Sequence, residues 1–171
     1  MQDEIRIRAA REHDCPAICD IYNHYVRSDT CTYALEPETL QERQAWLRDH
    51  GPDHPVIVAH TRDDVDTLVG WASLSPFHSR CGYRLTVEDT VYLDPAWRGR
   101  GVGSRLLGTL VQRARELGHH TIIAGISSEQ TASLALHERF QFARVAHLRE
   151  VGHKFGRWLD VVYMQRMLGH E

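Results

Sequence analysis

A glycine-rich segment with two arginines is the part of the sequence whose residue types most clearly point to chemistry. Arg98-Gly99-Arg100-Gly101-Val102-Gly103-Ser104 follows a predicted strand and precedes a predicted helix. Because glycine has no Cβ, alternating glycines allow several backbone N–H groups to face one anion. A helix N-terminus adds unpaired N–H groups and a favourable dipole, and Arg98 and Arg100 add positive charge. The segment therefore predicts a binding site for a diphosphate.

Other phosphate-binding motifs narrow the choice of ligand. The glycine spacing is Gly-x-Gly-x-Gly and lies past the middle of the chain, whereas a dinucleotide-binding loop carries Gly-x-Gly-x-x-Gly after the first strand. The Gly-Lys-Ser/Thr of a nucleoside-triphosphate loop is missing. The alternative without a ligand is a flexible glycine-rich turn with solvated arginines.

The cysteines and histidines do not form a recognisable metal-binding pattern. Cys15, Cys19, Cys31 and Cys81 contain no Cys-x-x-Cys pair, and the 12 histidines are scattered along the chain. We therefore predict no metal. The first residues show no signal-peptide pattern, so we expect a cytoplasmic protein with reduced thiols.

The overall composition is that of an ordinary globular chain. Its 171 residues are 42% hydrophobic and 25% charged, with a formal net charge of −3. We expect a single domain over residues 1–171. The slightly acidic balance argues against nucleic acid as a partner. No apolar run approaches the roughly 20 residues that span a bilayer, so no membrane association is expected.

The elements that must position these residues follow from hydrophobic periodicity. Strands are expected at 5–9, 56–59, 67–72, 86–93, 121–126, 142–151 and 158–166. Helices are expected at about 14–27, 38–50, 101–118 and 130–140. Asp14 is predicted as an N-cap, Asp63-Asp64 as a hairpin turn and Gly118 as a C-cap. The order predicts an α/β (α+β) domain with a central, mostly antiparallel mixed sheet and helices on both faces.

Several segments together resemble one known family. Arg-Gly-Arg-Gly-Val-Gly at 98–103 resembles the acetyl-CoA signature of the GNAT superfamily. The chain also resembles the phosphinothricin and methionine sulfoximine N-acetyltransferase branch over about residues 5–168. The segments that carry this closer resemblance are Ile21 to Val26, Thr86-Val87-Glu88, Val91-Tyr92, Ala132-Ser133-Leu134, Leu136-His137-Glu138 and Lys154 to Asp160.

The resemblance implies a cofactor site and an assembly. It implies acetyl-CoA as co-substrate and a GNAT sheet splayed at its middle, near the end of the strand at Leu93. The pantetheine arm would pair with backbone groups of Val91, Tyr92 and Leu93. Ser133 would lie near the cofactor, and Gln130 stands where the family usually has an asparagine that bonds the pantetheine. Members of this branch are usually homodimers.

Two residues are candidates for the chemistry of acetyl transfer. An amine must lose a proton before it attacks, and the resemblance makes Glu88 the general base, with apolar neighbours expected to raise its pKa. The alternative is an outward strand residue in solvent. His137 stands where many members carry a tyrosine acid, and a histidine can protonate the leaving thiolate. The alternative for His137 is a helix residue that packs against or hydrogen-bonds the cofactor.

The acceptor amine is expected beside the loop that joins the two strands next to the splay. Loop arginines can pair with a carboxylate or phosphinate of the substrate, and aromatic residues can wall the pocket. The candidates are Tyr33, Phe77, His78, Arg80, Tyr83 and Arg84. For each arginine the alternative is a solvated surface charge.

The function predicted from the sequence is transfer of acetyl from acetyl-CoA to a small amine, the α-amino group of a phosphinothricin, methionine sulfoximine or methionine sulfone type of amino-acid analogue. Two alternatives stay open at this point. The acceptor could be the amine of a peptide or protein. The chain could also be a non-catalytic module that senses acetyl-CoA.

Overall fold

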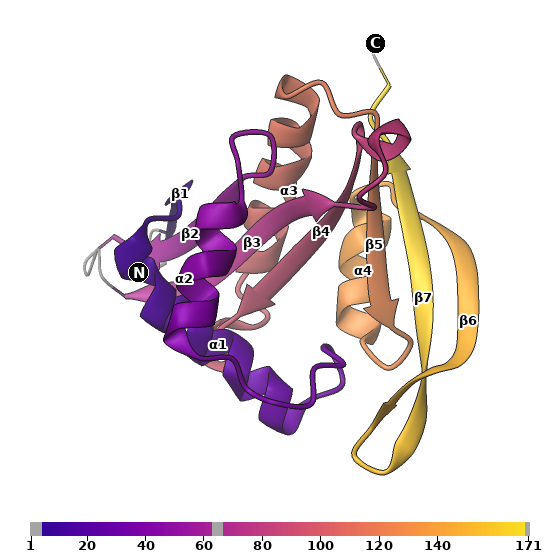
Figure 1. Cartoon of the computed structure of the whole chain (residues 1–171), viewed down its shortest axis with the longest axis horizontal. Coiled ribbons are helices and arrows are strands. Elements are labelled where there is room, and N and C mark those ends of the chain that lie inside the picture. The colour runs from indigo at the N-terminus through magenta and orange to yellow at the C-terminus, as the bar shows by residue number, and fades with distance from the viewer. Residues whose placement is uncertain (1–4, 63–66, 170–171) are drawn as a thin grey trace.

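A seven-stranded mixed sheet organises the chain, in a computed structural model that describes residues 5–62 and 67–169 (Figure 1). The order across the sheet is β1-β2-β3-β4-β5-β7-β6. Neighbouring strands are antiparallel except for β4 and β5, which are parallel. The strands are β1 (Ile5–Ala9), β2 (Val56–Thr61), β3 (Leu68–Pro76), β4 (Thr86–Leu93), β5 (Thr121–Ser127), β6 (Ala143–Lys154) and β7 (Arg157–Met167). The predicted mixed, mostly antiparallel sheet is confirmed.

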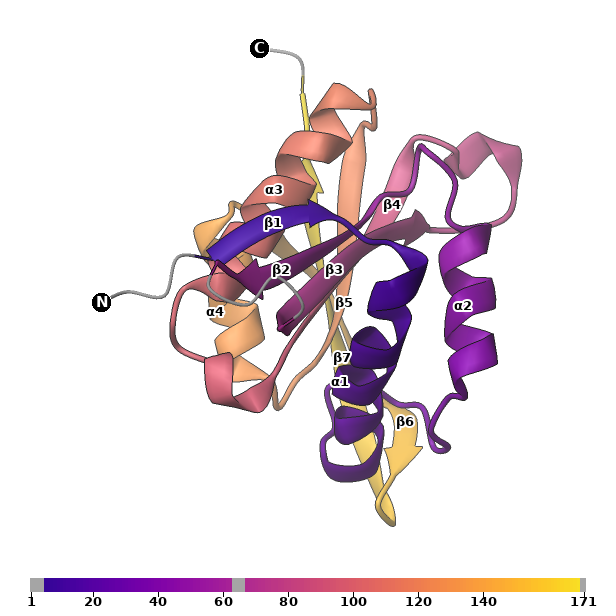
Figure 2. The ribbon, with the colours of Figure 1, turned by 90° about the vertical axis from the view of Figure 1, so that its left-hand side faces the viewer.

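Four helices cover the two faces of this sheet. They are α1 (Cys15–Ser28), α2 (Leu40–Asp49), α3 (Val102–Glu116) and α4 (Thr131–Arg139). Helices α1 and α2 lie on one face, and α3 and α4 lie on the other (Figures 1 and 2). Helix α3 forms because its apolar residues recur at helical spacing, which buries Leu106, Leu107 and Leu110 against the sheet.

The sheet divides in its middle, as the resemblance implied. Strands β4 and β5 pair only from Thr86↔Thr121 to Glu88↔Ile123. Beyond these three pairs β5 continues along β7 as far as Ser127, while β4 continues along β3 as far as Leu93. The two strands therefore separate directly after Glu88, and the gap that opens between them is the splay of the sheet.

The predicted elements exist in the predicted order, with one local difference at Asp14. Asp14 precedes α1, but its side chain makes no cap hydrogen bond; the carboxylate instead accepts from Arg8 Nη1 at 2.7 Å and from the backbone N–H of Arg11 at 2.7 Å. Asp14 therefore occupies the predicted N-cap position without making the cap hydrogen bond. Gly118 does close α3, with φ of +77°, one residue beyond the C-cap position. The predicted turn at Asp63-Asp64 lies outside the described residues.

No helix in the described part of the chain is both long enough and apolar enough to cross a membrane.

Candidate active site

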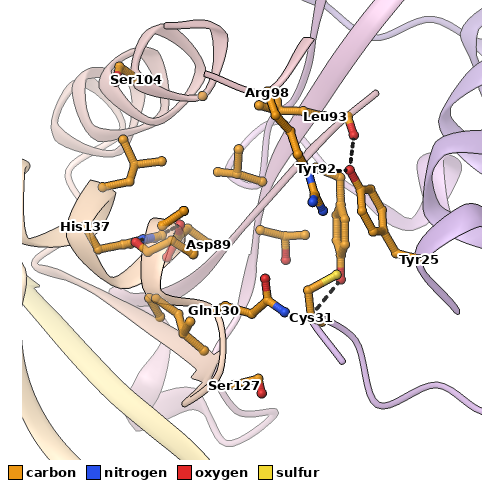
Figure 3. Close-up of a pocket in the computed structure, with 18 of the residues that line it drawn as sticks. Tyr25, Cys31, Asp89, Tyr92, Leu93, Arg98, Ser104, Ser127, Gln130 and His137 are labelled. Carbon is orange, nitrogen blue, oxygen red and sulfur yellow. Dashed lines mark hydrogen bonds and ion pairs between the residues drawn. The ribbon is translucent and has the colours of Figure 1, made fainter. Parts of the chain in front are cut away.

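A cavity of about 600 Å³ occupies the splay (Figure 3). Its walls come from β4, the glycine-rich loop, the end of β5 and helix α4, with Tyr25 and Cys31 closing one side. Most residues predicted to act at the cofactor or in the chemistry gather here: Glu88, Val91, Tyr92, Leu93, Arg98, Gly99, Gly101, Gly103, Ser104, Gln130, Ser133 and His137. Arg100 and Val102 are in the same loop but do not line the cavity.

The glycine-rich loop has the backbone geometry that its sequence predicted. Gly99 and Gly101 have φ of +74° and +80°, a left-handed conformation that side chains disfavour. Gly101 caps α3, so the first N–H groups of that helix, which have no acceptor within it, face the loop. Gly103 serves a different purpose, since a Cβ there would lie 3.4 Å from Leu136 of α4. The loop is therefore shaped to receive an anion.

The direction of the backbone groups of β4 follows from its register. The N–H of Asp94 donates to Val69 O at 2.9 Å, and Thr86 O accepts from Phe77 N at 3.3 Å, so even-numbered residues of β4 bond to β3. Along an antiparallel strand, the backbone N–H and C=O groups of successive residues point alternately to the two sides of the strand. The N–H and C=O groups of Val91 and Leu93 therefore point away from β3 and toward the splay. The Leu93 carbonyl already accepts from the Tyr25 hydroxyl at 2.5 Å. The backbone N–H and C=O groups of Val91 point toward the cavity in the same way.

Glu88 lies at the last residue pair before the strands separate. Its side chain reaches over β5, where a Cβ added to Gly125 would lie 3.3 Å from Glu88 Oε1. Burial raises the pKa of the Glu88 carboxyl, and the neighbouring charge of Asp89 raises it further, while His78 lowers it. The raised pKa confirms the direction expected from the sequence. The environment makes the ionised Glu88 a stronger base than a solvated glutamate.

His137 is held at both nitrogens of its ring. Its Nε2 lies 2.9 Å from Asp89 Oδ2, and its Nδ1 lies 2.8 Å from the carbonyl oxygen of Ser133. Burial disfavours the charged ring, but the hydrogen bond and charge of Asp89 outweigh it and raise the pKa of His137. Since both acceptors need an N–H donor, the arrangement fits a doubly protonated imidazolium and commits both of its protons to the protein.

A polar network at the edge of the cavity was not anticipated from the sequence. The Arg98 Nε donates to the Tyr25 hydroxyl at 3.1 Å, and its Nη2 lies 3.5 Å from Asp29 Oδ2. Asp29 Oδ1 also accepts from Gln130 Nε2 at 2.7 Å. The network thus joins the end of α1, the glycine-rich loop and the start of α4. No pattern near Asp29 signals this, because the partners are far apart in the chain.

The end of α1 is also tied to the far edge of the sheet. The Lys154 ammonium is buried and donates to the carbonyl oxygens of Asp29 at 2.7 Å and Thr32 at 2.8 Å. Burial lowers the pKa of Lys154. Carbonyl acceptors at the end of a helix suit a cation, so Lys154 fixes the segment that follows α1.

The residues predicted for the acceptor side do not line this cavity, although His78 lies close enough to Glu88 to lower its pKa. Of the described residues that line it, none comes from the 76–85 loop. In that loop His78 packs against Phe77 and Tyr83, with ring centroids 4.2 and 5.1 Å away, and Arg80 and Arg84 are exposed. Tyr33 donates its hydroxyl to Asp160 O at 2.7 Å. The cavity brings together the cofactor residues and Glu88, but it does not include the predicted acceptor residues.

Comparison with protein families gives one match that spans most of the chain. The profile described as the acetyltransferase (GNAT) family matches residues 17–142.

Similar proteins and structures agree with that match. A phosphinothricin N-acetyltransferase of Streptomyces coelicolor is 39% identical over 166 residues, covering 96% of this chain and 97% of its own. An L-methionine sulfoximine/L-methionine sulfone acetyltransferase of Salmonella typhimurium is 39% identical, covering 95% and 94%. The structure of a GNAT superfamily phosphinothricin acetyltransferase from Sinorhizobium meliloti in complex with acetyl-CoA superposes with a TM-score of 0.93, at 35% identity, covering 99% of this chain and 90% of that one.

Proposed function

Because this chain belongs to the GNAT acetyltransferase family and is an acetyl-CoA-dependent N-acetyltransferase, we propose that its acceptor is the α-amino group of a small amino-acid analogue. The class is that of phosphinothricin, methionine sulfoximine and methionine sulfone, an α-amino acid with an anionic or polar tetrahedral tail. The observation that carries the proposal is the partly buried Glu88 carboxylate at the point where β4 and β5 separate. Two relatives that share 39% identity with the chain are named for acceptors of this class.

The residues of the cavity fit acetyl-CoA. The left-handed glycines and the start of α3 offer N–H groups to its diphosphate, and Arg98 lies beside them. Val91 presents backbone N–H and C=O groups that can hydrogen-bond the amides of the pantetheine arm. Gln130 and Ser133 face the same space from α4. Bound there, acetyl-CoA supplies the activated acetyl group.

The chemistry assigned to the protein consists of proton removal and charge stabilisation. Glu88 accepts a proton from the substrate's ammonium group, directly or through one water, and frees the nitrogen lone pair. The amine nitrogen then forms a bond to the acetyl carbon, the carbon–sulfur bond breaks with its electron pair on sulfur, and the second proton lost by the nitrogen passes to the departing CoA thiolate. The N–H of Val91 faces the splay and stabilises the negative charge that develops on the acetyl oxygen.

We infer that the loop before β4 recognises the acceptor's carboxylate or anionic tail. Arg80 and Arg84 are exposed cations just before β4, the strand that carries Glu88. They would pair with the carboxylate or phosphinate of the substrate. The rings of Phe77, His78 and Tyr83 form one aromatic group beside them, and Tyr33 lies on the opposite side of the sheet division.

An acceptor panel tests the proposal. The protein is incubated with acetyl-CoA and with phosphinothricin, methionine sulfoximine, methionine sulfone, unmodified amino acids or short peptides, and release of the CoA thiol is followed. We expect turnover of the tetrahedral-tail analogues. Turnover of peptides alone would assign a peptide amine as the acceptor, and acetyl-CoA binding without any turnover would assign a sensor.

The exposed edge of the sheet supports a homodimer. Strand β6 is the last strand, and its side chains Val145, Leu148 and Val151 are 53%, 41% and 53% exposed, with Trp158 of β7 63% exposed. A long apolar edge strand invites pairing with another chain unless it is covered. We assign a second copy of this chain as its cover. Sedimentation should give a dimer, and Val151→Glu should give a monomer; a wild-type monomer would remove this part of the proposal.

We also propose a cytoplasmic location for the protein. Cys15, Cys19, Cys31 and Cys81 are all free in the structure. Free thiols fit a compartment in which glutathione and thioredoxin keep cysteines reduced.

A further inference from the structure

One buried ion pair spans the place where the sheet divides. Asp89 is the first residue of β4 beyond its pairing with β5, and His137 lies on α4, the helix that follows β5. Their side chains are 1% and 4% exposed and meet at 2.9 Å (Figure 3). The pair therefore joins the two walls of the cavity at the point where backbone hydrogen bonds between them end.

The pair is built into its surroundings on each side. The second nitrogen of His137 bonds the Ser133 carbonyl within α4, and the ring packs edge-on against Phe142 at 5.0 Å. These contacts fix the orientation of the ring relative to the helix. Asp89 is fixed by the strand, because its neighbours Glu88 and Thr90 are paired with β3. An orientation set at both ends makes the distance between β4 and α4 well defined.

We propose that Asp89 and His137 form a charged strut that sets the width of the splay, and that His137 acts as a positioning residue through Asp89 instead of donating a proton to the leaving thiolate. This inference rests on the proposed function, because it concerns the same cavity. The wall on β4 carries the backbone groups of Val91, and the wall on α4 carries Gln130 and Ser133. Acetyl-CoA must contact both walls at once.

The two roles proposed for His137 differ in whether one of its N–H groups is available to the leaving sulfur. A proton donor needs an N–H directed at the sulfur, but each N–H of His137 already has a protein acceptor within 2.9 Å. Donation would require breaking a bond to a carboxylate in a pair whose side chains are only 1% and 4% exposed, which is costly. A strut, by contrast, needs both bonds intact throughout the reaction.

Three variants test the strut: His137→Gln, Asp89→Asn, and the apolar pair Asp89→Val with His137→Leu. Each single change leaves a buried polar group without its charged partner, so we expect kcat/KM to fall by about 10²-fold through misplacement of the reacting atoms. The dissociation constant for acetyl-CoA should rise about tenfold, the equivalent of one lost hydrogen bond. The apolar pair restores contact between the walls, since buried ion pairs are often replaceable by apolar residues, and should recover most of the activity.

The acid role predicts a different pattern. If His137 donates a proton, the apolar pair stays as slow as His137→Gln in kcat while it binds acetyl-CoA like the wild type. That result would overturn the strut, and so would unchanged acetyl-CoA affinity in both single variants. His147→Gln is the matched control, because His147 forms an exposed pair with Asp160 at 2.7 Å and does not line the cavity. It should leave the acetyl-CoA affinity unchanged.

A measurement on the wild-type protein avoids any dependence on the folding of the variants. Nitrogen-15 NMR of the imidazole groups distinguishes a doubly protonated ring from a neutral tautomer. We expect His137 to be doubly protonated at pH 7, both in the free protein and with acetyl-CoA bound. A neutral ring in either state contradicts the strut. Acetyl-CoA affinity and ring protonation are measured without an acceptor, so a failure of the acceptor panel would leave this test standing.

Discussion

The carboxylate of Asp29 accepts a hydrogen bond from the Gln130 side chain at 2.7 Å, at the edge of the cavity and between residues 101 positions apart in the chain. Asp29 also accepts from the N–H of Cys31 at 2.9 Å and faces Arg98. The segment after α1 is thereby attached to both the glycine-rich loop and α4.

Asp29→Ala should lower the free energy of unfolding by about 1–3 kcal/mol, because it leaves partly buried donors without an acceptor. Chemical denaturation monitored by fluorescence measures the change. Asp20→Ala is the control, since Asp20 is exposed on α1, the helix that ends just before Asp29. Equal stability of the two variants would show that the Asp29 network contributes nothing to the fold.

Glu88→Gln should reduce kcat by about 10²–10⁴-fold, the usual contribution of a general base. Because the pKa of Glu88 is raised from 4.5 by burial and by Asp89, the wild-type kcat/KM should decline as pH falls through that raised value. The variant should lack this acid limb. Glu116→Gln, at an exposed position of α3, should behave like the wild type. An acid limb that persists in Glu88→Gln would assign it to another group.

Gly125→Val should slow the reaction more than it affects the fold. A Cβ at this position would lie 3.3 Å from both Glu88 Oε1 and the Tyr163 ring, so the carboxylate must move. Valine itself suits a strand. We expect kcat to fall about tenfold or more, because small displacements of reacting groups are costly, while the melting temperature changes little. Gly51→Ala, where an added Cβ meets nothing within 4 Å, is the control.

Stability should depend on pH through His137. Although burial opposes it, Asp89 raises the pKa of His137 in the folded protein above 6.5. The stabilisation is therefore fully present below the unfolded-state pKa and is lost as pH rises through the folded-state pKa. Unfolding free energies measured between pH 6 and 9 should decline for the wild type more than for His137→Gln. Parallel curves would show that the His137 ring is neutral in the folded protein.

The elements of this fold were predictable because their signals are local. Strand β4 has the predicted bounds of Thr86–Leu93, and the loop at Gly99 and Gly101 has the conformation that alternating glycines favour. Both follow from residues adjacent in the chain. The same holds for the helical period of α3.

The contacts between side chains were not predictable, because they depend on how distant elements meet. Asp89 and His137 are 48 residues apart, and neither has a sequence pattern that indicates the other. Gly125 did carry a usable signal, since a glycine within a strand often marks a close approach by another group. The 76–85 loop does not line the cavity, so the role predicted for its arginines in binding the acceptor stays a prediction.

Within the described part of the chain, the backbone pairing between the four-strand and three-strand halves of the sheet consists of three residue pairs. Past Glu88, β4 and β5 do not form the backbone hydrogen bonds that would join them in a continuous sheet. A ligand with its own amide groups can occupy the position of a strand between them. Amide hydrogen exchange in the free protein should then reveal two separately opening halves. With acetyl-CoA in place, the two halves should open as one cooperative unit.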